Sequence, residues 1–103
     1  MTYTVYWTGE ALEDLRRLED FLVGMALEHG DLGLPERAVS AIRSELRILQ
    51  TNPYTCRRAD GHPLERELVI PFGNAGYVAL FHIIGEREVA ISALRHQRED
   101  DYH

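Results

Sequence analysis

The sequence predicts an α+β fold in which two helices cover one face of a largely antiparallel sheet. Three observations support this prediction: an aromatic and β-branched start at residues 3–8, two apolar stripes of helical spacing in residues 9–52, and three strand-like segments in residues 64–94. The element order is therefore β-α-α-β-β-β. Because the helical stripes need a sheet face to cover them, we expect a two-layer sandwich built as one domain over residues 1–103.

The first helix is expected to begin after the opening strand, which joins one edge of the sheet. Thr8 is a suitable N-cap, since its hydroxyl can accept a hydrogen bond from the first helical turn. Apolar residues then recur every three or four positions, which places them on one helix face. This stripe consists of Leu12, Leu15, Leu18, Leu22 and Met25. The glycines within residues 30–33 end the helix.

The second helix is expected to begin at Pro35, because proline is favoured in the first helical turn. It should end at Asn52, because the residue before a proline such as Pro53 is pushed out of the helical region. Its apolar stripe consists of Ala38, Ile42, Leu46 and Leu49. Two helices joined by so short a connection form a hairpin.

Three further strands are expected in the second half of the chain. Residues 54–63 are polar and irregular, and the alternation over residues 64–70 then indicates a strand. Residues 71–76 indicate a turn, residues 77–84 form an apolar strand, and residues 88–94 form the last strand. Short connections between consecutive strands predict an antiparallel meander.

The composition of the chain argues against several classes of protein function. The net charge is −6, and all eleven basic residues are arginines, so direct DNA binding through bulk electrostatics is not expected. No apolar run approaches the ~20 residues of a membrane span, and the N-terminus has no features of a secretion signal. Cys56 is the only cysteine, which fits a reducing cytoplasm. The histidines show no metal-ligand spacing, so neither a metal nor a cofactor is expected.

The last nine residues, 95–103, are the most suggestive functional segment. They follow an apolar strand and bring Arg95, His96, Arg98 and Tyr102. Neighbouring strands lie about 5 Å apart, so Arg66 and His82 could converge with these side chains. Arginine binds phosphate in a bidentate fork, histidine can carry a proton near neutral pH, and tyrosine can stack on bases. Such a set could cleave RNA through its 2′-hydroxyl, or it could form a binding surface.

Structural interpretations of the same residues stay open. A strand arginine such as Arg66 usually pairs with a cross-strand carboxylate, and His82 in an apolar strand is commonly a satisfied, partly buried histidine. Arg16 and Arg17 are expected on the solvated face of the first helix. Three aromatic residues are expected in the core or at its edge: Tyr3, Trp7 and Tyr77.

Short motifs along nearly the whole chain follow one another in a familiar order. They are Trp7-Thr8 with Ala11-x-x-Asp14-Leu15, the second-helix stripe ending in Asn52-Pro53, Arg66-Glu67-Leu68, the run from Tyr77 to Ile83, and a tail of the form His-x-Arg followed by Tyr. This ordered set resembles the RelE/ParE superfamily of toxins from type II bacterial toxin–antitoxin modules. The resemblance implies a toxin that a cognate antitoxin, ParD-like or similar and encoded beside it, holds inactive.

The two branches of this superfamily imply different targets. ParE-like members inhibit DNA gyrase, whereas RelE-like members cut mRNA in the ribosomal A site. The lack of lysine and the net charge of −6 favour the ParE-like branch, and hence gyrase or another topoisomerase as the target. A ribosome-dependent endoribonuclease is the alternative, and a non-toxic family member that acts as a binding module is the third possibility.

The resemblance also assigns roles to individual residues. In the RelE-like branch the catalytic positions match Arg66, His96, Arg98 and Tyr102, although Glu65 and Glu67 stand where that branch usually brings lysine. For antitoxin or target contacts, the expected residues are Arg57, Arg58, Arg95, His96 and Arg98. The expected antitoxin surface is the outer face of the helical hairpin together with an exposed sheet edge.

Overall fold

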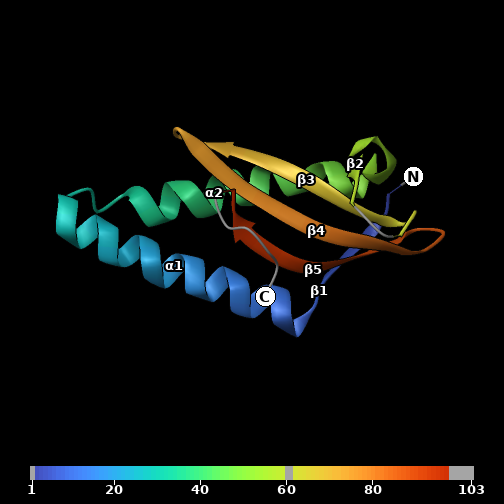
Figure 1. Ribbon diagram of the computed structural model, residues 1–103, viewed down its shortest axis with the longest axis horizontal. Helices are drawn as coiled ribbons and strands as arrows, with labels where there is room; N and C mark the ends of the chain where they lie inside the picture. The colour runs from blue at the N-terminus through green and yellow to red at the C-terminus, as the bar shows by residue number, and fades with distance from the viewer. Residues whose placement is uncertain (1, 60–61, 98–103) are drawn as a thin grey trace.

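The structure, a computed structural model, describes residues 2–59 and 62–97. The helices are α1 (Gly9–His29) and α2 (Leu34–Leu46), followed by two 3₁₀-helices, η1 (Arg47–Gln50) and η2 (Pro53–Thr55). The strands are β1 (Thr4–Trp7), β2 (Arg57–Arg58), β3 (Glu65–Phe72), β4 (Ala75–Gly85) and β5 (Glu88–His96). Figure 1 shows these elements, and the predicted α+β class is confirmed.

All five strands form one mixed sheet in the order β1-β5-β4-β3-β2. The meander of β3, β4 and β5 is antiparallel as predicted, and β1 lies at one edge, parallel to β5. The short strand β2 was not predicted. It pairs with β3 through Arg57 opposite Glu67 and Arg58 opposite Arg66. Two residues are too few for a side-chain alternation to reveal a strand.

The turn predicted over residues 71–76 is wrong. Strand β3 continues through Pro71 to Phe72, β4 starts at Ala75, and only Gly73 and Asn74 form the turn. Gly73 has a φ of 60°, which glycine adopts without the cost that a Cβ would impose. A Gly-Asn pair between two strands is itself a hairpin signal. Pro71 is tolerated because β2 pairs with β3 only at Glu67 and Arg66, well short of this end.

Helix α1 begins where Thr8 joins it to the sheet. The Thr8 hydroxyl accepts a hydrogen bond from the Ala11 N–H at 3.2 Å, as predicted for an N-cap, and donates one to the Ile91 carbonyl of β5 at 2.9 Å. Leu12 does not belong to the buried stripe, since it is 52% exposed and lies about 100° around the helix from Ala11. The buried residues of α1 are Ala11, Asp14, Leu15, Leu18, Leu22 and Ala26.

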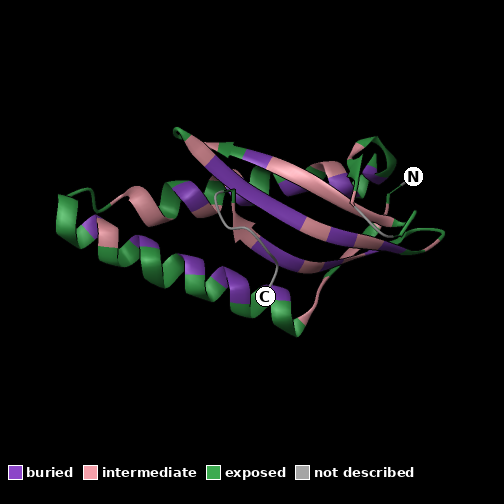
Figure 2. Ribbon diagram, viewed as in Figure 1, coloured by how far each residue is buried: buried purple, intermediate pink, exposed green. Residues whose placement is uncertain are grey.

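The core lies between the two helices and one face of the sheet. Figure 2 shows buried residues along the strands of the meander and on the sides of the helices that face them. The largest fully buried side chains include Phe81, Ile42, Leu49, Ile70 and Ile91. Helix α2 ends at Leu46, earlier than predicted, and η1 carries Leu49 into the core. Among the described residues, no helix has both the length and the apolar character needed to cross a membrane.

Candidate functional site

Arg66 and His82, which were predicted to converge, lie on opposite faces of the sheet. Arg66 is in register with Phe81, which belongs to the core between sheet and helices. His82 follows Phe81 on β4 and therefore points to the other face, where it is in register with Glu65. One site cannot use both side chains.

His96 is distant from Arg66 along the sheet. It lies on β5 opposite Tyr77, four residues along β4 from the position opposite Arg66, which corresponds to about 13 Å. Arg95 and His96 are strand residues, so the expectation that they follow the last strand is wrong. Arg98 and Tyr102 lie outside the described residues, and their predicted roles stay predictions.

Arg66 holds a neighbouring segment of its own chain against β3. Its Nη1 donates hydrogen bonds to the carbonyls of Tyr54 at 3.0 Å and Cys56 at 2.9 Å. Its guanidinium carbon lies 5.2 Å from the centre of the Tyr54 ring, a cation–π arrangement. Its Nε is buried and has no acceptor within the described chain. The cross-strand carboxylate expected for Arg66 is absent, since its neighbours in register are Phe81 and Arg58.

Two further pairs of ionisable side chains lie on the sheet face that points away from the helices. Arg57 Nε lies 3.1 Å from Glu67 Oε1, and His82 Nε2 lies 3.5 Å from Glu65 Oε2. Solvent-accessible pairs of this kind contribute little to stability. Arg58 is exposed, whereas Arg95 is partly buried, with Nη1 donating to the carbonyls of His96 at 3.3 Å and Gln97 at 3.4 Å. The predicted role of these arginines in partner binding stays a prediction.

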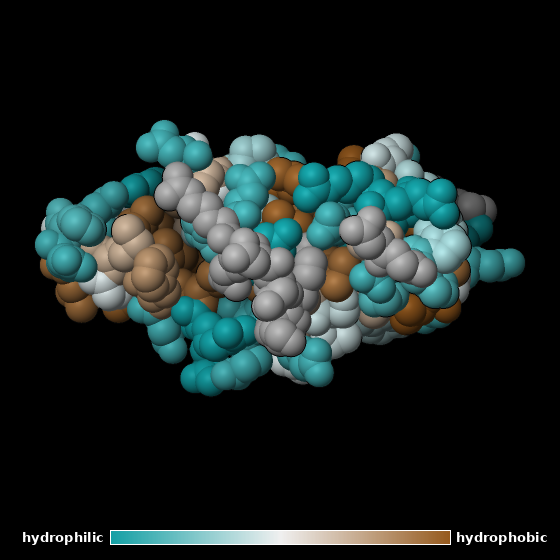
Figure 3. Space-filling view, in the orientation of Figure 1, coloured by the Kyte–Doolittle hydropathy of each residue, from teal (hydrophilic) through white to brown (hydrophobic). Residues whose placement is uncertain are grey.

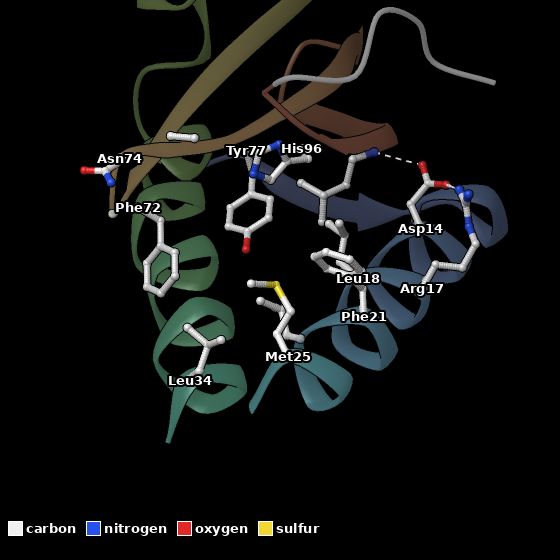
Figure 4. A pocket seen from close by; sticks show the side chains of 14 residues that line it. Asp14, Arg17, Leu18, Phe21, Met25, Leu34, Phe72, Asn74, Tyr77 and His96 are labelled. Carbon is white, nitrogen blue, oxygen red and sulfur yellow. Dashed lines mark hydrogen bonds and ion pairs between the residues drawn. The ribbon is translucent and has the colours of Figure 1, made fainter. Parts of the chain in front are cut away.

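A groove opens at the other end of the sheet, between α1, the start of α2 and the β3–β4 hairpin (Figure 4). Its volume is about 640 Å³. Its lining comes from both helices and three strands and comprises Asp14, Arg17, Leu18, Phe21, Leu22, Met25, Leu34, Phe72, Gly73, Asn74, Ala75, Tyr77, Leu94 and His96. The space-filling view shows apolar surface gathered at this end of the molecule, over the two helices (Figure 3).

The middle of the groove is apolar and accessible. Phe21 is 62% exposed although it lines the groove, and Met25, Leu34 and Phe72 are each partly buried around it. In Figure 4 these side chains extend from α1, α2 and β3 into one shared space. A contiguous apolar patch with a polar rim is typical of a protein-binding surface.

One end of the groove is polar. Asp14 is only 2% exposed, and its Oδ2 accepts a hydrogen bond from the Leu94 N–H of β5 at 2.9 Å. Strand β1 pairs with β5 only as far as Ile91. Beyond the end of β1, the Asp14 carboxylate accepts the hydrogen bond from β5 that a longer strand would have accepted. Asp14 also forms an ion pair with Arg17, one turn along α1. Arg17, expected on a solvated helix face, therefore borders the groove.

Tyr77 forms part of the groove wall nearest the sheet. Its ring centre lies 6.1 Å from that of Phe72 and 5.7 Å from that of His96, and the His96 ring is perpendicular to it. Tyr77 is 3% exposed, which confirms its predicted place in the core. Burial raises the pKa of its phenol, so the hydroxyl is a neutral hydrogen-bond donor at physiological pH.

Only part of this groove can be recognised from the sequence. Met25 belongs to the predicted stripe of α1 and Phe21 lies outside it, but spacing along one helix does not show that α1 leaves a gap beside the sheet. Leu34 and Phe72 complete the groove from elements far away in the chain. Three-dimensional packing, rather than periodicity, creates the site.

The comparisons with known proteins agree with one another. A family model described as the ParE toxin of the type II toxin–antitoxin system parDE matches residues 5–101. Among solved structures, a chain from one titled "Chromosomal ParDE TA system from P. aeruginosa" superposes with a TM-score of 0.73 at 22% sequence identity. The match covers 91% of this chain and 95% of that chain, and it shows a shared fold. Among curated proteins, none matches this chain.

Proposed function

Because the chain belongs to the ParE toxin family of type II toxin–antitoxin systems, we propose that it arrests growth by inhibiting DNA gyrase or another topoisomerase. As the toxin component of such a module, it has an antitoxin as its partner. We further propose that the chain acts in the cytoplasm and that a defined surface on it binds the antitoxin.

The position of Arg66 is the observation that supports a topoisomerase over the ribosome. A RelE-like nuclease would use this arginine to stabilise charge on a reacting phosphate, close to a group that moves a proton. Here Arg66 Nη1 is bound to the carbonyls of Tyr54 and Cys56, and His96 lies about 13 Å further along the sheet. An arginine whose guanidinium is bound to carbonyls of its own chain is poorly placed to bind an RNA phosphate.

We place the antitoxin in the groove rather than on the outer face of the helical hairpin, where the sequence had suggested it. Phe21 exposes a large apolar surface there, and Met25, Leu34 and Phe72 surround it. Burying such side chains against a partner stabilises a complex by about 25 cal/mol for each Å² of apolar surface removed from water. The groove therefore provides the anchoring contacts that a tight inhibitor needs.

A paired assay on purified toxin tests the target. We expect the toxin to block supercoiling of relaxed plasmid by gyrase and to leave mRNA intact on programmed ribosomes. Toxin that has been mixed with its antitoxin should leave gyrase supercoiling active and the mRNA intact. Cleavage in the A site with normal supercoiling would establish the endoribonuclease alternative, and inactivity in both assays would point to a non-toxic binding module.

The arginines predicted to contact a partner can be tested in the same assays. Arg58 is exposed and lies at the opposite end of the sheet from the groove, and its side chain forms no hydrogen bond or ion pair with another described residue. If Arg58 contacts the target, Arg58→Glu should weaken gyrase inhibition while antitoxin binding stays the same. Equal inhibition by Arg58→Glu and the unchanged toxin would remove this residue from the contact surface.

A further inference from the structure

One exposed side of α2 carries opposite charges that the fold leaves unpaired. Glu36 and Arg43 are exposed, and neither side chain forms a hydrogen bond or ion pair with another described residue. With Val39 and Ser40 between them, they line an open hollow of about 560 Å³ between the two helices. We call these four residues the charged face of α2. The antitoxin groove is lined by other residues, so this face has no partner so far.

The spacing along α2 explains why these charges stay unpaired. Side chains on a helix meet when they are three or four residues apart. The residues at those distances from Arg43, none of them acidic, are Val39, Ser40, Leu46 and Arg47. Glu36 lies seven residues before Arg43, which is nearly two turns and about 10.5 Å along the helix axis. The two charges therefore share one side of α2 without forming an ion pair.

The lack of a partner distinguishes Arg43 from other exposed arginines of the described chain. Arg16, Arg37 and Arg57 each form an ion pair with a carboxylate of the same chain. The chain has seventeen acidic residues and only eleven arginines, so a missing partner is not caused by a shortage of acids. Unpaired Glu36 and Arg43 are therefore available to a second molecule.

The charged face of α2 is complementary to itself. Glu36 and Arg43 lie at equal distances along the helix from the midpoint between Val39 and Ser40. If two copies of α2 pack antiparallel around a two-fold axis at that midpoint, Glu36 of each copy lies beside Arg43 of the other. Val39 and Ser40 at the axis are small enough for the usual interaxial distance of about 8–10 Å. Antiparallel packing also brings opposite ends of the two helix dipoles together.

We propose that the charged face of α2 is a self-association surface, on which two copies of the toxin pack antiparallel and form two Glu36–Arg43 ion pairs across a two-fold axis. The contact is small and largely polar, so the dimer is reversible and weakened by salt. The groove is lined by other residues, so each toxin of the dimer can still bind an antitoxin. The inference does not depend on which target the toxin inhibits.

The same two charges also suit the ends of α2 as a single helix. Glu36 lies in the first turn and Arg43 in the last turn, where the helix dipole favours an acid and a base. Reversing either charge should therefore lower the melting temperature slightly, whether or not two copies associate. Reversing both charges separates the two roles: it opposes the dipole twice, but it rebuilds the ion pairs across the axis.

Sedimentation velocity at low salt, over a concentration series from micromolar to millimolar, measures the association of the full chain. Glu36→Arg and Arg43→Glu should each weaken it at least about tenfold, because the two-fold axis doubles the effect of one substitution. The double variant should regain most of the affinity. Glu86→Arg and Arg58→Glu are matched controls, since they change the net charge equally at exposed residues outside this face, and they should leave association unchanged.

Recovery in the double variant supports the inference, even if that variant melts at a lower temperature than the unchanged toxin. A toxin that stays monomeric at every concentration would overturn it, as would equal association of the unchanged toxin and both single variants. Weak association in the double variant, despite a cooperative thermal melt, would assign the two charges to the helix dipole alone. Calorimetry with the antitoxin encoded beside the toxin gives the last outcome: if Arg43→Glu weakens antitoxin binding but not self-association, this face belongs to the antitoxin and the inference is wrong.

Discussion

The two ends of the sheet each have an arginine and a tyrosine, yet they differ in what surrounds those side chains: backbone carbonyls at one end and an open, largely apolar groove at the other. At the end near β2, Arg66 lies over Tyr54 and donates to two backbone carbonyls. At the groove end, Tyr77 forms part of the groove wall, and Arg17 stands at the rim of an exposed apolar surface. The residue types are alike, so the surroundings decide which end is structural and which can bind.

The difference has a simple cause in the fold. The 3₁₀-helix η2 and strand β2 fold back beside β3, which brings backbone carbonyls to Arg66. At the other end, α1 is attached to β5 through Thr8 and Asp14, and the groove lies between the later turns of α1 and the β3–β4 hairpin. One end is covered by the chain, whereas the other presents apolar side chains to a partner.

Two adjacent residues of α1 give the largest expected contrast. Leu22 is 5% exposed and Phe21 is 62% exposed. Leu22→Ala should lower the free energy of unfolding by about 3 kcal/mol, because it opens a cavity in the core. Phe21→Ala should change it by less than about 1 kcal/mol while weakening antitoxin binding. Urea unfolding and calorimetric titration measure both; equal destabilisation by the two variants would place Phe21 in the core.

Arg66→Ala should have the next largest effect. It removes two charge-assisted hydrogen bonds to backbone carbonyls, and we expect the free energy of unfolding to fall by about 2 kcal/mol. Arg58→Ala, a neighbouring exposed arginine, is the control and should be close to neutral. A stable Arg66→Ala protein that has lost toxicity would instead assign Arg66 a direct role in the reaction.

Two glycines should respond with opposite signs. Gly73 forms part of the groove wall with a φ of 60°, so Gly73→Ala should cost about 1 kcal/mol of folding free energy. Gly24 lies within α1, where an added Cβ meets nothing within 4 Å, so Gly24→Ala should stabilise the fold by about 0.5–1 kcal/mol. Thermal unfolding of the two variants gives the signs. A stabilising Gly73→Ala would mean that the hairpin turn has a different backbone.

The smallest expected effect is at alkaline pH. Burial raises the pKa of Tyr77, so below its unfolded pKa of about 10 the phenol is neutral in both states and no stability is lost. As the pH rises above that value, the unfolded chain ionises first and the free energy of unfolding falls. Tyr77→Phe should therefore lose less stability between about pH 9 and 10.5 than the unchanged protein does, as measured by urea unfolding. Identical losses would indicate that Tyr77 is not desolvated.

Much of the fold was predictable from local patterns. Thr8 as an N-cap, Leu15, Leu18 and Leu22 of the α1 stripe and the antiparallel meander depend on residues near one another in the chain, and these are confirmed. Of the other two stripe residues, Leu12 is exposed and Met25 is only partly buried. Strand β2 was missed because two residues show no alternation. The β3–β4 turn is shorter than predicted, because Pro71, a common turn residue, lies here in a strand with a partly unpaired edge.

The site was much less predictable, since it depends on which surroundings each residue meets. Arginine is a residue type that suits phosphate binding, but the structural role of Arg66 follows from its hydrogen bonds to the carbonyls of Tyr54 and Cys56. No pattern in the strand sequence predicts those hydrogen bonds. Tyr77 was expected in the core, yet the direction of its hydroxyl depends on Phe72 and His96. Phe21 differs from an ordinary exposed residue only because a groove lies beside it.

Amide hydrogen exchange of the toxin with and without its antitoxin tests the difference between the two ends most directly. The antitoxin should increase protection in residues 17–25 of α1 and in residues 72–77 of the hairpin, and leave residues 54–58 unchanged. Protection confined to residues 54–58 and 65–67, with the groove unchanged, would contradict the account and make the Arg66 end the binding surface.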